Sequence, residues 1–247
     1  LVARTTTDTL TNKTLTDPSI TDKIIHSGDT NTAIRFPAAD TFTVETAGSE
    51  RLRVDSGGRL GIGTDSPSSY SSSTNNLVIS ETGGNSGLTL HTGTSNSSFL
   101  GFTDTGDTNN QGYIGYNHSD NALVFAANSA EAFRVDSSQR VIIGATSARV
   151  VGTNRQFTIE GTDSPTSSAS IFRNSNNSAG AVLALGKSRG TSDGSSTVLQ
   201  SGDQSGAIFF YGADGTDAVS QVASISAEID GTPGSNDMPG RLVFNTT

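Results

Sequence analysis

Residues 41–64, TFTVETAGSERLRVDSGGRLGIGT, contain three short runs in which apolar and polar residues alternate. Alternation with a period of two places all the apolar side chains of a strand on one face. Clusters of Gly and Ser separate the runs, and these residues are typical of tight turns. The stretch therefore predicts three short antiparallel strands joined by hairpins, with every apolar residue on the same face.

The positions of the turns also predict the strand register. A turn at Gly57 sets the second run against the third, and a turn near Gly48 sets the first against the second. The predicted pairs are Val54–Leu60, Leu52–Ile62, Val44–Leu52 and Phe42–Val54. A slip of one residue would turn the apolar set of a strand toward solvent, so this register is strongly specified.

The same pattern returns at residues 122–145, ALVFAANSAEAFRVDSSQRVIIGA. Arg134-Val135-Asp136-Ser137 repeats Arg53-Val54-Asp55-Ser56, and Gly144 repeats Gly63. A third copy is expected to begin at Arg241. In the second copy Gln139 stands where the first has Gly58, which argues against a left-handed backbone at that loop position, because such a backbone favours Gly.

The chain is too poor in apolar residues for each unit to stand alone. Hydrophobic residues make up 32% of the 247 and charged residues 16%, and no sustained helical stripe is present, so an all-β fold is expected. Three strands with one apolar face are not independently stable in water. The face must meet another face, and copies of the same chain are the obvious source, which predicts a homo-oligomer with the seam on its axis.

A set of apolar residues is expected to be buried between chains or against its own unit. It comprises Phe42, Val44, Leu52, Val54, Leu60, Ile62, Leu123, Phe125, Phe133, Val135, Val141, Ile143, Leu242 and Phe244.

A different repeat occupies the N-terminal part of the chain, where Leu10, Leu15, Ile20 and Ile25 recur every five residues. An odd spacing sends successive side chains of a flat strand to opposite faces. We interpret this part as a connector threaded around its symmetry mates. A pentapeptide-repeat β-helix is the alternative, although four copies are few for a solenoid.

The repeats divide the chain into three β units with connecting segments. Stretches such as GLTLHTG (87–93), SIFRN (170–174) and GAVLALGKS (180–188) are read as further strands of sandwich-like modules. The division is 1–30 for the pentad connector, 31–67 for the first meander unit, 68–75 for a linker, 76–148 for the second unit, 149–155 for a linker, and 156–247 for the third unit, which we interpret as truncated. We expect the natural chain to continue with the rest of a third meander.

Composition excludes several kinds of partner. The formal net charge of −9 argues against nucleic-acid binding, which needs clustered cations. The absence of cysteine rules out disulfides and thiolate metal sites. No apolar run approaches the roughly 20 residues of a membrane-spanning helix. We therefore expect no cofactor, no nucleic-acid partner and no membrane insertion.

Motifs that carry chemistry are weak here. Gly190-Thr191-Ser192-Asp193-Gly194 matches the nucleophile-elbow pattern but lacks a following helix former and a downstream His. His26, His91 and His118 have no metal-ligand spacing, and an axial site in an oligomer is the one arrangement left open for them. Asp104–Asn109 and Asp214–Asp217 depart from the calcium-loop pattern, so turns are favoured. No catalytic or metal site is expected.

Three stretches resemble a known class of protein. LTNKTLTDPSI at 10–20 looks like the thread motif of bacteriophage tail-fibre proteins, and SERLRVDSGGRLGIGTDSP at 49–67 looks like the repeat that precedes the intramolecular chaperone domain in many of them. ISAEIDGTPGSNDMPGRLVFNTT at 225–247 is similar to another stretch common in those proteins. Together the three cover roughly a third of the chain.

The resemblance implies an elongated, β-rich homotrimeric fibre in the extracellular virion, structural in role and involved in host attachment. Its implied partners are other virion tail proteins and a host surface glycan or protein. Two other classes stay open: a polysaccharide-degrading enzyme embedded in a fibre, and a bacterial surface adhesin. Ligand contacts, if present, are expected on the long loops 187–206 and 230–239, because binding residues usually lie on loops held by a rigid scaffold.

Overall fold

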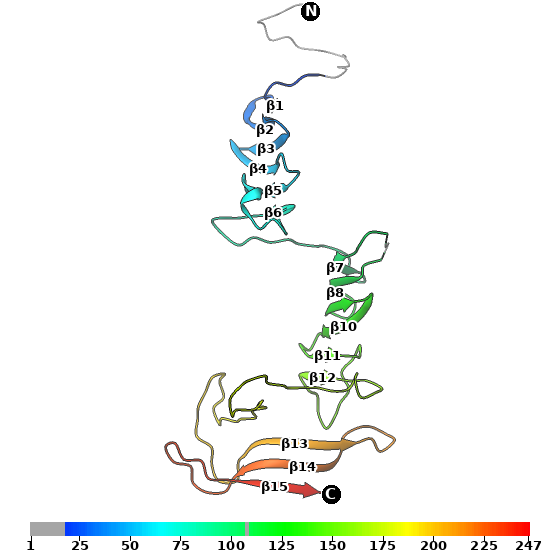
Figure 1. Ribbon diagram of the computed structural model, residues 1–247, viewed down its shortest axis with the longest axis vertical. Coiled ribbons are helices and arrows are strands. Elements are labelled where there is room, and N and C mark those ends of the chain that lie inside the picture. The colour runs from blue at the N-terminus through cyan, green and yellow to red at the C-terminus, as the bar shows by residue number, and fades with distance from the viewer. Residues whose placement is uncertain (1–17, 107–108) are drawn as a thin grey trace, which may run out of the picture. The chain divides into compact units, whose positions relative to one another are not determined.

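The computed structural model describes residues 18–106 and 109–247, and its regular structure is almost entirely β-strand. The chain divides into two compact units, residues 1–89 and 90–247. The first contains one sheet and the second contains two (Figure 1). The expectation of an all-β fold built from antiparallel meanders is therefore confirmed.

The first unit contains a six-stranded sheet in which the strands follow one another in sequence order, as Figure 1 shows. Its strands are β1 (Lys23–His26), β2 (Asp29–Ala38), β3 (Thr41–Thr46), β4 (Ser49–Val54), β5 (Leu60–Ile62) and β6 (Leu77–Ile79), with a short 3₁₀ helix η1 (Pro67–Ser69) between the last two. The four predicted residue pairs of this meander are all present, so its register is confirmed.

The second unit begins with a sheet of the same design, again ordered by sequence. Its strands are β7 (Ser97–Phe102), β8 (Gly112–Asn117), β9 (Ala122–Ala127), β10 (Ala130–Val135), β11 (Val141–Ile143) and β12 (Phe157–Ile159). A three-stranded sheet follows, formed by β13 (Gln204–Gly212), β14 (Ser220–Ile229) and β15 (Gly240–Thr246).

The third sheet begins another copy of the pattern. Phe244 on β15 pairs with Ile225 on β14, just as Phe125 on β9 pairs with Ile114 on β8. Leu242 pairs with Ala227 in the position where Leu123 pairs with Tyr116. Strand β15 is therefore equivalent to the first strand of a meander, as the sequence alignment predicts.

The last strand of each six-stranded sheet differs from the expected division. Leu77–Ile79 and Phe157–Ile159 were expected to open the second and third units, yet each pairs in parallel with the strand that completes the preceding meander. A parallel partner needs a crossover longer than a hairpin. Residues 63–76 and 144–156 provide these crossovers. The segments assigned as linkers between units therefore connect two strands of the same sheet.

A glycine permits the close approach of the parallel strand. Gly63 has a φ of 72° and Gly144 a φ of 81°, a backbone region that favours Gly. A Cβ added at either position would collide with a backbone carbonyl oxygen, that of Ser80 or that of Glu160. The matching glycines of the two copies therefore reflect a steric requirement of the sixth strand.

Two other expectations need correction. Residues 23–30, assigned to the extended connector, form β1 and the start of β2 in the first sheet, whereas the connector up to residue 17 lies outside the described residues. The stretches at 87–93, 170–174 and 180–188 alternate like strands but form none. Alternation identifies a strand only when a partner is within reach, and these segments lack one in the single chain.

Candidate functional site: the uncovered apolar faces

One face of the first sheet carries two columns of apolar side chains that run across its strands. Because paired residues lie side by side on the same face, the register defines each column. The first column is Ile24, Ile34, Val44, Leu52, Ile62 and Ile79, and the second is Phe42, Val54, Leu60 and Leu77, with the ring of Phe36 beside that of Phe42 at 6.3 Å between centroids. The sequence pattern predicted the middle of this surface, and the outer strands extend it to six strands.

The second sheet carries the same two columns. They are Leu100, Ile114, Phe125, Phe133, Ile143 and Ile159 in the first, and Tyr116, Leu123, Val135, Val141 and Phe157 in the second. The rings of Phe125 and Phe133 stack with centroids 4.4 Å apart, which is consistent with their predicted placement on one face. We call this surface on each six-stranded sheet the apolar face.

The single chain does not cover the apolar faces. Of the residues predicted to pack here, the twelve on the six-stranded sheets are half-buried or, for Ile62, exposed. Leu242 and Phe244 on the third sheet are 66% and 72% exposed. The chain's own unit therefore buries these residues only in part, and their burial between chains stays a proposal.

The chain buries the opposite face of each sheet instead. Thr43, Arg53, Gly61 and Val78 form the central column there, and Thr43 is fully buried. A Cβ on Gly61 would touch Thr64 and Pro67, so the crossover to the sixth strand packs on this face. In the second sheet the central column is Gly115, Val124, Arg134, Ile142 and Thr158.

Sequence reasoning missed this covered face because its residues look like the polar side of the alternation. Two residues of the second copy indicate this burial, because Val124 and Ile142 stand at positions where a solvent-facing strand would carry polar residues. Only seven hydrophobic residues are buried among those described, and three of them, Val78, Val124 and Ile142, lie in these two columns. The intrachain core is therefore small and lies on the side away from the apolar face.

An arginine on the covered face is held by a glutamate three residues before it. Arg53 donates two hydrogen bonds of 2.7 Å to Glu50, and Arg134 donates two of 2.6 Å to Glu131. Residues three apart lie on opposite faces of a regular strand. Arg51 and Ala132 have no cross-strand partner in the register and form β-bulges. Each bulge returns the glutamate and the arginine of its pair to the same face. The hydrogen bonds to these glutamates raise the pKa of both arginines.

The loop after this strand is held by an aspartate. Asp136 Oδ1 accepts hydrogen bonds from the backbone amides of Ser138 and Arg140, and its Oδ2 accepts one from Arg140 Nε at 2.8 Å. Asp55 makes the equivalent bonds with Gly57 and Arg59. The side-chain hydrogen bond from Arg140 lowers the pKa of Asp136 more strongly than any other contact does.

These contacts correct one prediction. Gln139 has a φ of 63° and Gly58 a φ of 75°, so the loop position is left-handed in both copies. The loop closes through the bond from the Gln139 amide to the Asp136 carbonyl at 2.8 Å, together with the aspartate contacts. We infer that these bonds outweigh the cost of about 1 kcal/mol for a non-glycine residue in this region.

The residues considered for catalysis or metal binding are not assembled into a site. Ser192 lies in a turn with no strand before it and no helix after it among the neighbouring described residues. The described residues contain no cluster of three His, Asp or Glu side chains that could hold a metal. His118 packs edge-on against Tyr116, with ring centroids 4.9 Å apart. Among the described helices, none has the length and apolarity to cross a membrane.

The acidic loops behave as turns where the structure describes them. Asp214 Oδ1 accepts hydrogen bonds from the amides of Thr216 and Asp217 at 2.9 and 3.1 Å, which is an Asx-turn. These backbone bonds lower the pKa of Asp214. Part of the other acidic loop, at residues 107–108, lies outside the described residues.

The long loop before β13 is tied to the sheet by Asp203. This carboxylate accepts hydrogen bonds from Arg189 Nε at 2.6 Å, from Lys187 Nζ at 3.2 Å and from the amide of Gln200 at 2.9 Å. The bond from Arg189 contributes most to a pKa of Asp203 far below its usual value. The base of the loop is therefore fixed, while residues 190–196 project from it.

Comparisons with known proteins identify no relative. No protein-family model matches the sequence, and a search of curated proteins gives no significant match.

Proposed function

We propose that the chain is a structural segment of a homotrimeric, β-rich virion fibre of the bacteriophage tail-fibre kind, which mediates or supports attachment to the host surface. The observation that carries the proposal is the repeated sheet with a continuous apolar face that its own chain leaves uncovered. A contiguous apolar surface of this kind marks an interaction site in a soluble protein.

Three copies around an axis would satisfy this surface. A sheet with one apolar face needs a second layer, and identical faces can supply it to one another around a closed symmetry axis. The two sheets present the same columns in the same register, so the same mode of packing between copies can serve each of them. The resemblance of residues 10–20, 49–67 and 225–247 to tail-fibre sequences supports the number three and the virion context.

An enzyme embedded in a fibre is the second candidate. Such depolymerases usually present clustered carboxylates on a long parallel β-helix, whereas the described sheets are mainly antiparallel and their Asp and Glu residues mostly serve turns and arginine pairs. Incubation with host surface polysaccharide, followed by measurement of reducing ends, tests this alternative. Release of reducing ends that a single side-chain substitution abolishes would favour the enzyme.

A bacterial surface adhesin is the third candidate, and the location of the native protein distinguishes it. Antibodies raised against the chain should label purified phage particles and not the envelope of uninfected bacteria.

The mass of the chain in solution is the primary test. A trimer has a mass of about 76 kDa, three times the 25.3 kDa of the chain. Light scattering coupled to size exclusion should report this value at micromolar concentration. A folded 25.3 kDa monomer with its apolar faces exposed would contradict the proposal.

The attachment role is tested at two loops that the structure allows to be shortened. The amide of Arg189 donates a hydrogen bond of 3.2 Å to the carbonyl of Thr197, and the amide of Asp230 donates one of 3.3 Å to the carbonyl of Pro239. Residues 190–196 and 231–238 can therefore be replaced by short turns without moving the ends apart. We expect reduced host adsorption of the assembled particle, and unchanged adsorption would place receptor contact elsewhere.

A further inference from the structure

Two segments with the sequence of strands have no backbone partner. No backbone–backbone hydrogen bond involves residues 168–186 or 81–92, all of which the structure describes. Val182, Leu183 and Leu185 are 75%, 68% and 52% exposed. Leu88 and Leu90 in the other segment are 58% and 43% exposed. Figure 1 accordingly draws no arrow between β6 and β7 or between β12 and β13.

The two segments occupy the same place in the repeat. Each follows the sixth strand of one sheet and precedes the first strand of the next. A recurrence at equivalent positions indicates that the unpaired alternation belongs to the design of the repeat.

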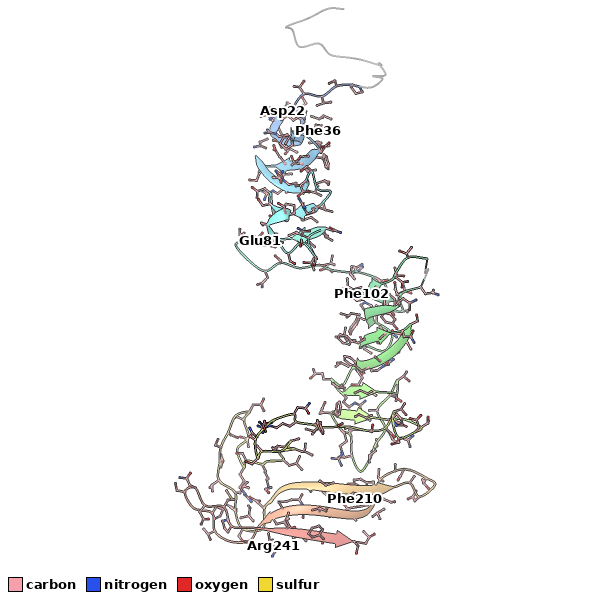
Figure 2. The ribbon with its side chains drawn as sticks, in the orientation of Figure 1. Asp22, Phe36, Glu81, Phe102, Phe210 and Arg241 are labelled. Atoms are coloured by element: carbon pink, nitrogen blue, oxygen red, sulfur yellow. The ribbon has the colours of Figure 1, made fainter. Side chains whose placement is uncertain are left out.

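A free strand edge lies directly after each segment. Strands β7 and β13 are the first strands of their sheets and pair on one side only. Soluble proteins usually protect such edges with charged residues or Pro. Neither strand contains a charged residue or Pro, since β7 reads SSFLGF and β13 reads QSGAIFFYG. Phe99 and Phe210 on these strands are about half exposed. Figure 2 shows Phe210 on the three-stranded sheet. An edge so unprotected is suited to accept a strand.

Within its own chain the second segment crosses the face of the third sheet. Leu183 and Leu185 line a shallow groove together with Gly206, Ile208 and Leu242. A Cβ on Gly206 would approach the Cβ of Leu185 to 2.7 Å, so the segment lies over the sheet. The tie between Lys187 and Asp203 fixes its end near the start of β13. In this position its backbone cannot also pair with the β13 edge.

We propose that residues 180–186 of each chain add as a strand to the free edge of β13 in a neighbouring copy, and that residues 87–93 do the same at β7. The inference rests on the trimer of the proposed function. Donor segment and acceptor edge are different surfaces of one chain, and such a head-to-tail contact closes when it is repeated around a three-fold axis. Every donor and every edge is then satisfied.

The absence of cysteine from the chain permits a direct test. Two differently tagged versions are refolded together, one with Ala184→Cys and the other with a single cysteine at each of positions 205 to 209 in turn. A disulfide between the versions can form only between chains, and it requires Cα atoms within about 7 Å. We expect a linked heterodimer at one or two adjacent positions. Ala184→Cys paired with Val243→Cys on the far strand β15 is the matched control and should not link.

The outcomes separate this inference from the trimer itself. A trimeric mass without a linked heterodimer at any of positions 205 to 209 would overturn the strand exchange and leave the trimer intact. A monomeric mass would overturn both. Amide hydrogen exchange on the unsubstituted trimer provides an independent measurement. The amides of residues 180–186 should be protected by at least 100-fold relative to the unfolded chain, and exchange at the unfolded rate would contradict the proposal even if a cysteine variant failed to fold.

Discussion

The two six-stranded sheets share a framework of polar contacts and glycines but fill their covered faces with different residues. Both keep the Glu–Arg pair across a bulge, the Asp–Arg loop and the glycine beneath the sixth strand. In the covered column, Gly61 and Thr43 of the first sheet correspond to Ile142 and Val124 of the second. The polar contacts and the glycine are therefore common to both sheets. The space on the covered face is filled by residues of the crossover in the first sheet and by a strand side chain in the second.

Thr64 and Pro67 show how this exchange works. They lie where a side chain on Gly61 would project, whereas in the second sheet Ile142 fills the corresponding space and is fully buried. Cores tolerate such redistribution when the total volume is kept. The apolar faces, in contrast, stay apolar in both copies, which is expected of a surface shared by one assembly.

The largest expected effect is a charge on the apolar face. Val54→Asp and the equivalent Val135→Asp should each cost several kcal/mol per trimer, because three carboxylates would lose water without gaining a partner. Light scattering should show dissociation or a loss of folding. Ser56→Asp, at an exposed turn position, is the control and should leave the trimer intact. A stable trimer of both aspartate variants would show that the faces are not interfaces.

The next largest effect concerns the glycine beneath the sixth strand. Gly63→Ala and Gly144→Ala should each destabilise the fold by roughly 3 kcal/mol, since the added Cβ meets a backbone carbonyl at a left-handed φ. Gly58→Ala is the matched control: its φ is 75° but nothing lies within 4 Å of the added Cβ, so only about 0.5 kcal/mol is expected. Denaturant unfolding measures both, and equal losses would refute the steric explanation.

A smaller effect should follow acidification. The folded-state pKa of Asp136 is lowered by its hydrogen bond from Arg140, so its contribution is fully present above the unfolded pKa of about 3.9 and is lost as pH falls through the folded value. Asp136→Asn should therefore be less stable than the parent at pH 7, with the difference shrinking below about pH 4. A difference that is constant from pH 7 to pH 2 would contradict this account.

The smallest effect distinguishes the two loops. Gln139→Gly should stabilise the second meander by about 0.5 kcal/mol, because relief of the left-handed strain exceeds the added entropy of the unfolded chain. Gly58→Gln in the first meander should lose a similar amount. Thermal unfolding of the two variants should shift in opposite directions, and shifts of the same sign would show that the loops are not equivalent.

The alternating pattern is sufficient to predict the meanders. Apolar residues at every second position and Gly/Ser turns fix both strand direction and register, since a slip of one residue would expose a whole strand's apolar set. The pairs Val54–Leu60 and Phe42–Val54 and the start of a third copy at β15 followed from this rule. The apolar faces were predicted for the same reason, because alternation is local information.

Other contacts depend on how the chain packs in three dimensions and cannot be predicted from the alternating pattern. The parallel sixth strand joins residues separated by a long loop, and no local period encodes it. The burial of Arg134 and the packing of Thr64 and Pro67 where a side chain on Gly61 would lie are also not encoded by the alternation. Conversely, alternation at residues 87–93 and 180–188 predicted strands that the single chain does not form. A strand exists only where another backbone meets its amides and carbonyls, and that partner is a property of the fold and of its assembly.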